Sequence, residues 1–231
     1  MGKRTERMSR EEEKKTEKGA VEQETEPSGG NSAEADPEAG ERLDVVDGYG
    51  FPTGQVVSRG EAHAKGIRHR TAHVWLVRRK NGGLEILLQK RSREKDAYPG
   101  CYDISSAGHV PAGSDYLSSA IRELREELGI QADARELHYC GRRWVYQEGF
   151  FHGRPFVDNQ VSQVYYLWRD VEPEQLTLQE AEVESVSWME LEQCRAWVAT
   201  GPTDTCIAAE ELDLLAGTLY GWKKKTLFPA K

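Results

Sequence analysis

Several features that this 231-residue sequence lacks limit what it can be. No apolar run approaches the ~20 residues that a membrane-spanning helix needs, so we expect no membrane segment. The formal net charge of −8 gives no support to non-specific binding of nucleic acid. The four cysteines form no C-x-x-C pair, which predicts reduced thiols and a cytoplasmic protein.

The first 43 residues lack aromatic residues and contain almost no large aliphatic ones. They are rich in Glu, Lys, Ser, Gly and Pro, a composition that cannot bury enough apolar surface to offset the entropy lost on ordering. The apolar segment of a secretory signal peptide is also missing. We therefore predict a disordered charged tail over residues 1–43 and one folded domain over residues 44–231.

Apolar patterns and turn signals predict the elements of the folded part. Expected strands cover a hairpin at residues 43–57, followed by 70–78, 84–90, 137–146, 160–168 and 183–189. Expected helices cover residues 117–128, 189–200 and 206–220, and a short charged turn at 58–66 is partly helical. Residues 146–156 are expected to form an aromatic-rich loop. Strands and helices interleaved in this order predict a layered α/β/α domain.

One segment, residues 108–130, carries the strongest functional signal. Glu123, Glu126 and Glu127 are three and four residues apart, so they share one face of the expected helix. Like charges at this spacing destabilise a helix by roughly 0.2–0.5 kcal/mol per pair, whereas Mg²⁺ prefers oxygen ligands. These three residues, hereafter the acid row, predict a divalent-metal site. A solvated acidic face paired with neighbouring arginines is the alternative.

The loop before this helix completes a recognisable pattern. Residues 108–113 begin and end with glycine, and such a loop exposes backbone N–H groups that suit phosphate. The whole segment resembles the Nudix box, G-x5-E-x7-R-E-U-x-E-E-x-G-U, where U is bulky and apolar. The matching residues are Gly108, Arg122, Glu123, Leu124, Glu126, Glu127, Gly129 and Ile130. Ser114 departs from the pattern, because it stands where the first glutamate is expected.

The resemblance implies an α/β fold, the Nudix-type α/β/α sandwich around a mixed sheet. It also implies Mg²⁺- or Mn²⁺-dependent cleavage of a small-molecule diphosphate. The implied metal ligands are the acid row (Glu123, Glu126 and Glu127) and the Gly108 carbonyl. Glu126 or Glu123 would act as the general base, and Arg122 would orient a carboxylate. A nearby aspartate, Asp115, could replace the missing glutamate at Ser114, whose loss should weaken the site.

Further site residues are expected outside the box. A fourth carboxylate ligand is sought among Glu148, Glu180, Glu182 and Glu184, and Glu182 is favoured. Lys90 and Arg91 follow an expected strand and could bind the phosphates of the substrate, although a basic surface turn is an equal alternative.

A second constellation refines the resemblance. His69, Arg70, Thr71, Ala72 and His73 read H-R-T-A-H, and His109 follows Gly108. With the runs Leu-Leu-Gln-Lys-Arg-Ser and Tyr-Pro-Gly-Cys-Tyr-Asp-Ile-Ser-Ser-Ala-Gly-His, these residues resemble the isopentenyl-diphosphate isomerase-like branch of the Nudix superfamily. His73 and His109 would then contact the substrate.

One position argues against isomerase chemistry. Ala107 stands where true isomerases carry a catalytic cysteine, and an alanine cannot relay a proton. Three functions remain open: a hydrolase of nucleotide- or isoprenoid-type diphosphates, an isopentenyl-diphosphate isomerase, and a non-catalytic diphosphate-binding module. The aromatic residues of 146–156 could stack on a base, line an isoprenoid pocket, fill the core or form the surface of a homodimer.

Overall fold

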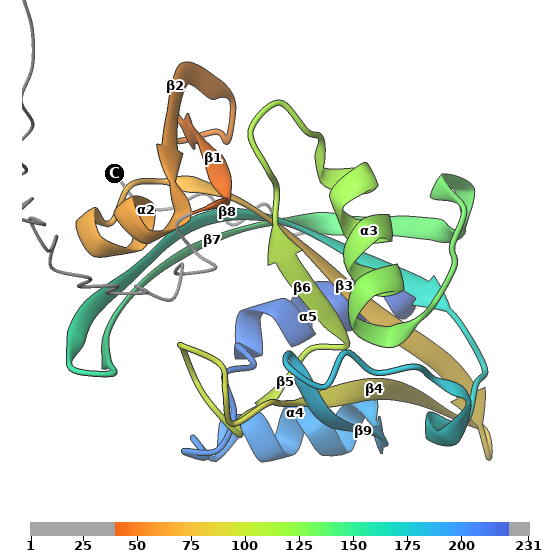
Figure 1. Ribbon diagram of the computed structural model, residues 1–231. Helices are drawn as coiled ribbons and strands as arrows, with labels where there is room; N and C mark the ends of the chain where they lie inside the picture. The colour runs from red at the N-terminus through yellow and green to blue at the C-terminus, as the bar shows by residue number, and fades with distance from the viewer. Residues whose placement is uncertain (1–39, 222–231) are drawn as a thin grey trace, which may run out of the picture. The chain divides into compact units, whose positions relative to one another are not determined.

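The computed structural model describes residues 40–221 of the chain (Figure 1). The predicted disorder of residues 1–39 lies outside the described residues. Within them, β1 (Arg42–Val46) pairs with β2 (Pro52–Ser58) as the expected hairpin. The first strand thus begins two residues before the expected domain start.

A seven-stranded sheet forms the centre of the fold. Its strands are β3 (His69–Lys80), β4 (Gly83–Arg91), β5 (Tyr102–Asp103), β6 (Ser106–His109), β7 (Leu137–Phe151), β8 (Arg154–Trp168) and β9 (Val183–Glu190). The order is β5-β4-β3-β8-β7, and β6 pairs with β3 while β9 pairs with β4. Because β3 and β8 are parallel and the other pairs are antiparallel, the sheet is mixed.

Helices cover both faces of this sheet (Figure 1). The alternation along β3 shows how: Val74 and Leu76 pack in the core with α3 (Tyr116–Leu128). Trp75 and Val77 point the other way, into the core formed with α4 (Leu191–Ala199) and α5 (Ala209–Leu219). The predicted α/β/α sandwich around a mixed sheet is therefore confirmed.

The helix that carries the acid row has well-defined ends. Asp115 caps the start of α3 by accepting a hydrogen bond from the Ser118 backbone N–H (2.9 Å). Gly129 ends the helix in the left-handed conformation (φ 70°). A Cβ at this glycine would lie 2.8 Å from Thr177 Cβ. Both the left-handed backbone and the lack of space therefore require glycine here. The frame of α3 therefore follows from local sequence.

The prediction of an aromatic-rich loop at residues 146–156 is wrong. Strands β7 and β8 extend through this region, paired from Leu137 with Leu167 to Phe151 with Arg154. The turn between them is only His152 and Gly153, at φ values of 47° and 75°. Positive φ at both positions is the geometry of a two-residue hairpin turn. Histidine is not a usual residue for it, so the sequence carries no clear turn signal.

The smaller helices also differ slightly from expectation. The charged turn is α2 (Arg59–Lys65), and two 3₁₀ turns follow later, Ala134–Glu136 and Pro173–Gln175. The last expected helix begins at Ala209 rather than residue 206, because the Cys206 N–H donates to the Tyr102 carbonyl (3.0 Å) beside β5. Among residues 40–221, no helix has both the length and the apolar character needed to cross a membrane.

Candidate functional site

A cavity of about 480 Å³ lies where β3 changes its partner. Residues 71–74 of β3 pair with β6, whereas residues 77–80 pair with β4. The cavity lining combines residues of β3, β4, β5, β6, β7, β8, α2 and α3. It brings together most of the predicted site residues: His73, Arg91, Gly108, His109, Arg122, Glu123, Glu126, Glu127 and Glu182.

Lys90 does not belong to this set in the described part of the chain. Its Nζ lies 2.8 Å from Glu184 Oε1, on the other side of the strand from the cavity-lining Arg91. Arg91 is held by Asp103 (2.9 Å) and by the Ala97 carbonyl. The two adjacent basic residues therefore have different surroundings.

Arg122 organises the acid row. Its guanidinium donates to Glu123 Oε1 (2.6 Å) and to Glu126 Oε2 (3.2 Å). It also donates to the His109 carbonyl (3.1 Å), which ties α3 to the end of β6. One side chain thus orients two carboxylates and fixes them relative to the loop that follows β6.

The backbone of β6 lies directly against the acid row. The Ala107 N–H donates to Glu127 Oε2 (3.2 Å). At Gly108 a Cβ would overlap the carboxyl group of Glu123, so no side chain fits there. The glycine at the start of the box is therefore explained by close approach to the acid row rather than by a positive φ.

Electrostatics show that the acid row is short of positive charge. Burial raises the pKa of Glu127 to about 8, and the neighbouring Glu123 adds to the effect. Burial also raises the pKa of Glu123 to about 7, despite the contact with Arg122. Carboxyl groups that are buried together and resist ionisation fit a hard divalent cation, which would stabilise their charged form.

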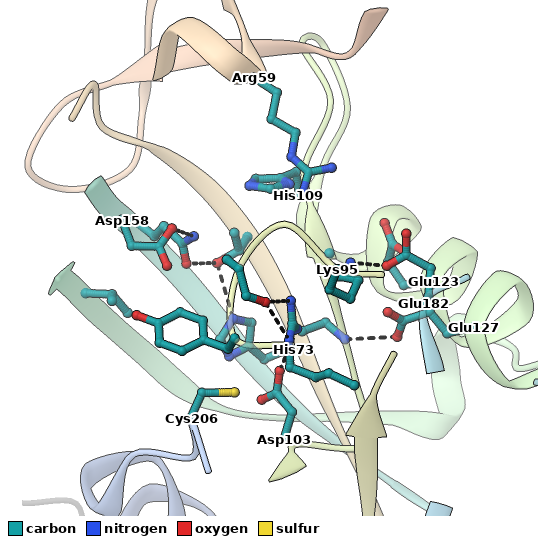
Figure 2. A pocket seen from close by; sticks show the side chains of 18 of the residues that line it. Arg59, His73, Lys95, Asp103, His109, Glu123, Glu127, Asp158, Glu182 and Cys206 are labelled. Carbon is teal, nitrogen blue, oxygen red and sulfur yellow. Dashed lines mark hydrogen bonds and ion pairs between the residues drawn. The ribbon is translucent and has the colours of Figure 1, made fainter. Parts of the chain in front are cut away.

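Glu182 lies immediately before β9 and lines the cavity on the same side as the carboxyl groups of α3. Its carboxylate forms an ion pair with Lys95, a half-buried residue of the loop after β4. In Figure 2, Glu123, Glu127 and Glu182 lie together on one side of the pocket. Sequence reasoning missed Lys95, because nothing in its own segment marks it as a cavity residue.

Three histidines form a second group of potential ligands: His63, His69 and His109 lie with one ring nitrogen each within 4.8 Å of the others. The Nδ1 atoms of His63 and His69 face the backbone carbonyls of Val157 (3.3 Å) and Ile67 (2.8 Å). A carbonyl only accepts, so both Nδ1 atoms carry the proton and both Nε2 atoms keep a lone pair.

The charge state of these histidines suits ligation. Burial lowers the pKa of His63 to about 3 and of His69 to about 4, and holds that of His109 well below its usual value. Neutral imidazoles can bind a transition metal. Within residues 40–221, His69 Nε2 is buried and has no hydrogen-bond partner. The cluster is a possible position for a softer ion than Mg²⁺.

His73 has a different partner from the other histidines. Its Nδ1 lies 3.0 Å from Glu211 Oε2, and Glu211 is a buried residue of α5. Sequence analysis did not select Glu211, because it is separated from His73 by 138 residues. No local signal could have paired them.

The aromatic residues of the β7–β8 hairpin divide into two groups. Phe156 lines the cavity and stacks on His63, with ring centroids 4.3 Å apart. Phe151 contacts both Phe156 and Tyr98 through edge-to-face packing. Tyr146 and Phe150 are 66% and 69% exposed, on the other face of the hairpin. Only the first group can contact a molecule in the cavity.

The positions that bear on isomerase chemistry are also visible. Ala107 lines the cavity, and so does Cys206, whereas Cys101 does not belong to the lining in the described part. Burial raises the pKa of the Cys206 thiol well above its usual value.

The position that departs from the box has a structural role. Ser114 uses its backbone carbonyl to accept from Arg70 (2.9 Å). Asp115, the suggested replacement for the missing glutamate, serves as the α3 cap instead.

Comparisons with known proteins agree with this geometry. A family model described as "NUDIX domain" matches residues 67–205, more than half of the 231-residue chain. The chain is 38% identical over 165 residues to Nudix hydrolase 3 of Arabidopsis thaliana, which covers 70% of this chain and 21% of that protein. It is 37% identical over 136 residues to an uncharacterized Nudix hydrolase of Clostridium acetobutylicum, with coverages of 59% and 64%.

The chain spans less than two thirds of the length of these two relatives. A third relative, an uncharacterized Nudix hydrolase of Listeria monocytogenes, is 31% identical over 161 residues, and the match covers 86% of its length. Among solved structures, DR0079 from Deinococcus radiodurans is similar with a TM-score of 0.55 and 21% identity, covering 75% of this chain and 98% of that one. This likeness supports the fold.

Proposed function

Because this chain belongs to the NUDIX domain family, we propose that it is a Mg²⁺- or Mn²⁺-dependent hydrolase of small diphosphate compounds. It cleaves a diphosphate linkage in a nucleotide- or isoprenoid-type substrate. The observation that carries the proposal is the acid row at the side of a polar cavity, where Glu123 and Glu127 lie against the backbone of Gly108 and Ala107. The relatives named Nudix hydrolases support the same reaction class.

The proposed roles follow from the contacts. Glu123, Glu126, Glu127 and the Gly108 carbonyl would hold the cation, with Glu182 beside them as a further ligand. When bound, the cation neutralises these carboxylates and the charge of the substrate phosphates, and it favours ionisation of a water molecule. Each of these groups reaches the same cavity, which is the geometric requirement for a shared site.

Protein groups supply the remaining steps. Glu123 or Glu126 accepts the proton of the attacking water, and Arg122 holds both carboxylates in place. Arg91, which also lines the cavity, contributes positive charge for the phosphates. His109 lines the cavity next to Gly108 and contacts the substrate there.

Two alternative functions are less well supported. The first alternative is an isopentenyl-diphosphate isomerase, which the H-R-T-A-H run supports. Ala107, however, has no side-chain group that could transfer a proton. Cys206 reaches the cavity from a different segment, with a thiol that burial keeps protonated. A non-catalytic module would not need the desolvated carboxyl groups of Glu123 and Glu127, which are costly without a cation.

The test is a hydrolysis assay with purified protein and Mg²⁺ or Mn²⁺. The panel contains nucleoside diphosphate sugars, dinucleoside polyphosphates, thiamine diphosphate and prenyl diphosphates. Cleavage that disappears on chelation and in Glu126→Gln supports the proposal, and Glu174→Gln, an exposed residue outside the cavity lining, is the matched control. Cleavage of none of these compounds, or interconversion of prenyl isomers without phosphate release, would contradict it.

A further inference from the structure

Lys95 has the most buried side chain of the four lysines within residues 40–221. It is 15% exposed, compared with 26% for Lys90, 44% for Lys80 and 66% for Lys65. Lysine is rarely withdrawn from water unless a charged partner compensates it. Here the partner is Glu182, whose carboxylate forms an ion pair with the Lys95 ammonium group inside the cavity lining.

The backbone brings this ion pair to the acid row from two directions. The Gln179 N–H donates to the Glu127 carbonyl (3.0 Å), which joins the segment before β9 to the end of α3. The Ser92 N–H donates to the Glu182 carbonyl (2.9 Å), and the Lys95 N–H donates to the Ser92 carbonyl (3.3 Å). Three segments that are distant in sequence are therefore fixed against one another at this corner of the cavity.

Lys95 supplies positive charge to the most buried member of the acid row. Burial is the main reason why the pKa of Glu127 is raised to about 8, and Lys95 acts against this increase. Figure 2 shows Lys95 next to the group formed by Glu123, Glu127 and Glu182. Because two positive ions repel each other at short range, an ammonium group held on Glu182 opposes the approach of a divalent cation to the same carboxylate.

We propose that Lys95 is an internal counter-ion of the cation site, and that a divalent cation must displace it from Glu182 to bind there. The inference rests on the proposed function, because it takes Glu182 and the acid row as cation ligands. In the cation-free protein the ammonium group compensates part of the negative charge. Cation binding opens the ion pair, so the apparent affinity is lowered by the fraction of molecules in which the pair is closed. Lys95 thus sets the cation concentration at which the site fills.

The first experiment measures cation binding without any substrate. The free Mn²⁺ signal in electron paramagnetic resonance gives the dissociation constant at about pH 8.5, above the raised pKa values of Glu123 and Glu127. If the pair is closed in about nine of ten molecules, Lys95→Met should bind Mn²⁺ about 10-fold more tightly than the wild-type protein. Lys95→Arg keeps a permanent positive charge and should stay within about 3-fold of the wild-type affinity.

Two further variants control this measurement. Glu127→Gln should lose the Mn²⁺ that the acid row binds, which separates it from Mn²⁺ bound elsewhere. Lys90→Met is the matched lysine variant, because Lys90 pairs with Glu184 (2.8 Å) on the other side of β4, and its affinity should equal that of the wild-type protein. Equal or weaker binding in Lys95→Met overturns the inference and leaves the hydrolase function intact. No Mn²⁺ binding that depends on Glu127 overturns the proposed cation site and this inference with it.

The second experiment uses only the wild-type protein, so it does not depend on the folding of a variant. Acetic anhydride acetylates neutral amines, and peptide mass spectrometry gives the rate for each lysine. An amine held in an ion pair reacts slowly, so Mn²⁺ at a concentration that fills the site should increase the rate at Lys95 by about 10-fold. Lys65, which pairs with Glu61 on α2, is the internal reference and should not change. An unchanged or slower rate at Lys95 would overturn the inference.

Discussion

The acid row shares its cavity with a second polar region, hereafter the polar wall, which is built differently. The polar wall consists of Asp158, Gln160, Thr71 and His73, which line the cavity, and the buried Glu211 behind them. The acid row comes from a single turn of α3, and its buried carboxyl groups have raised pKa values because their charge is not fully compensated. The polar wall comes from β8, β3 and α5, and its members are hydrogen-bonded to one another, while burial raises the pKa of its outer member Asp158 to about 6. The comparison indicates that the acid row needs an added cation, whereas the buried Glu211 carboxylate has its positive and hydrogen-bonding partners within the protein.

The largest expected effect comes from removing a charge from the acid row. Glu127→Gln should lower kcat/KM by about 10³-fold, because cation and transition-state stabilisation together contribute several kcal/mol. Folding should not suffer, since burial already disfavours the charged form of Glu127. Phosphate release and thermal unfolding, measured side by side, check this. A variant with near wild-type activity would mean that Glu127 holds no cation.

The matching change in the polar wall should act on stability. Glu211→Gln leaves His73 and Arg143 without their buried anionic partner, so we expect a loss of about 3 kcal/mol in the free energy of unfolding. Urea denaturation measures it, with Glu210→Gln expected to stay within about 0.5 kcal/mol of wild type. A Glu211→Gln variant as stable as the control would contradict a stabilising role for the contacts of Glu211 with His73 and Arg143.

These two regions also differ in how far sequence could predict them. The acid row, Gly108 and Arg122 lie within 20 residues, so helical periodicity and spacing were enough to group them. The polar wall combines Asp158, Thr71 and Glu211, which meet only because β3 pairs with β8 and α5 packs against that face. Contacts of this kind depend on tertiary packing, and no local pattern encodes them.

The fold shows the same division. Strand β3 and helix α3 follow from apolar alternation, helical periodicity and the Gly129 stop, and these predictions are confirmed, whereas the Asp115 cap was not predicted. The long β7–β8 hairpin was missed because its turn at His152 and Gly153 has an unusual first residue. Lys95 and Cys206 reach the cavity from irregular segments, whose course the sequence does not indicate.

A smaller effect is expected at Gly108, where backbone and acid row meet. Gly108→Ala would place a Cβ against the Glu123 carboxyl group, so Glu123 must move. We expect kcat/KM to fall by about 10²-fold with little change in unfolding, because displacement by about 1 Å is enough for such a loss. Gly60→Ala, at a glycine of α2 with open space around it, is the control. Full activity in Gly108→Ala would contradict the close approach.

The smallest effect concerns pH in the absence of cations. The pKa values of Glu123 and Glu127, about 7 and about 8, lie above that of an unfolded glutamate, so the folded protein binds more protons between about pH 4.5 and pH 8. The free energy of unfolding should therefore decrease as pH rises through this window. Urea titrations at several pH values check the slope.

Added Mg²⁺ should flatten that slope, because it favours the ionised carboxylates. The same pH series for Glu127→Gln should also be flatter than for wild type, whereas Glu174→Gln should not differ. A free energy of unfolding that increases over this pH range without cations would contradict the raised pKa values of the acid row.

The central claim is that the acid row, rather than the three histidines, holds the catalytic cation. A crystal of the protein soaked in Mn²⁺ and measured by anomalous diffraction tests it most directly. We predict an anomalous peak bounded by Glu123, Glu127 and the Gly108 carbonyl. A peak only at His63, His69 and His109, or none in the cavity, would contradict the account.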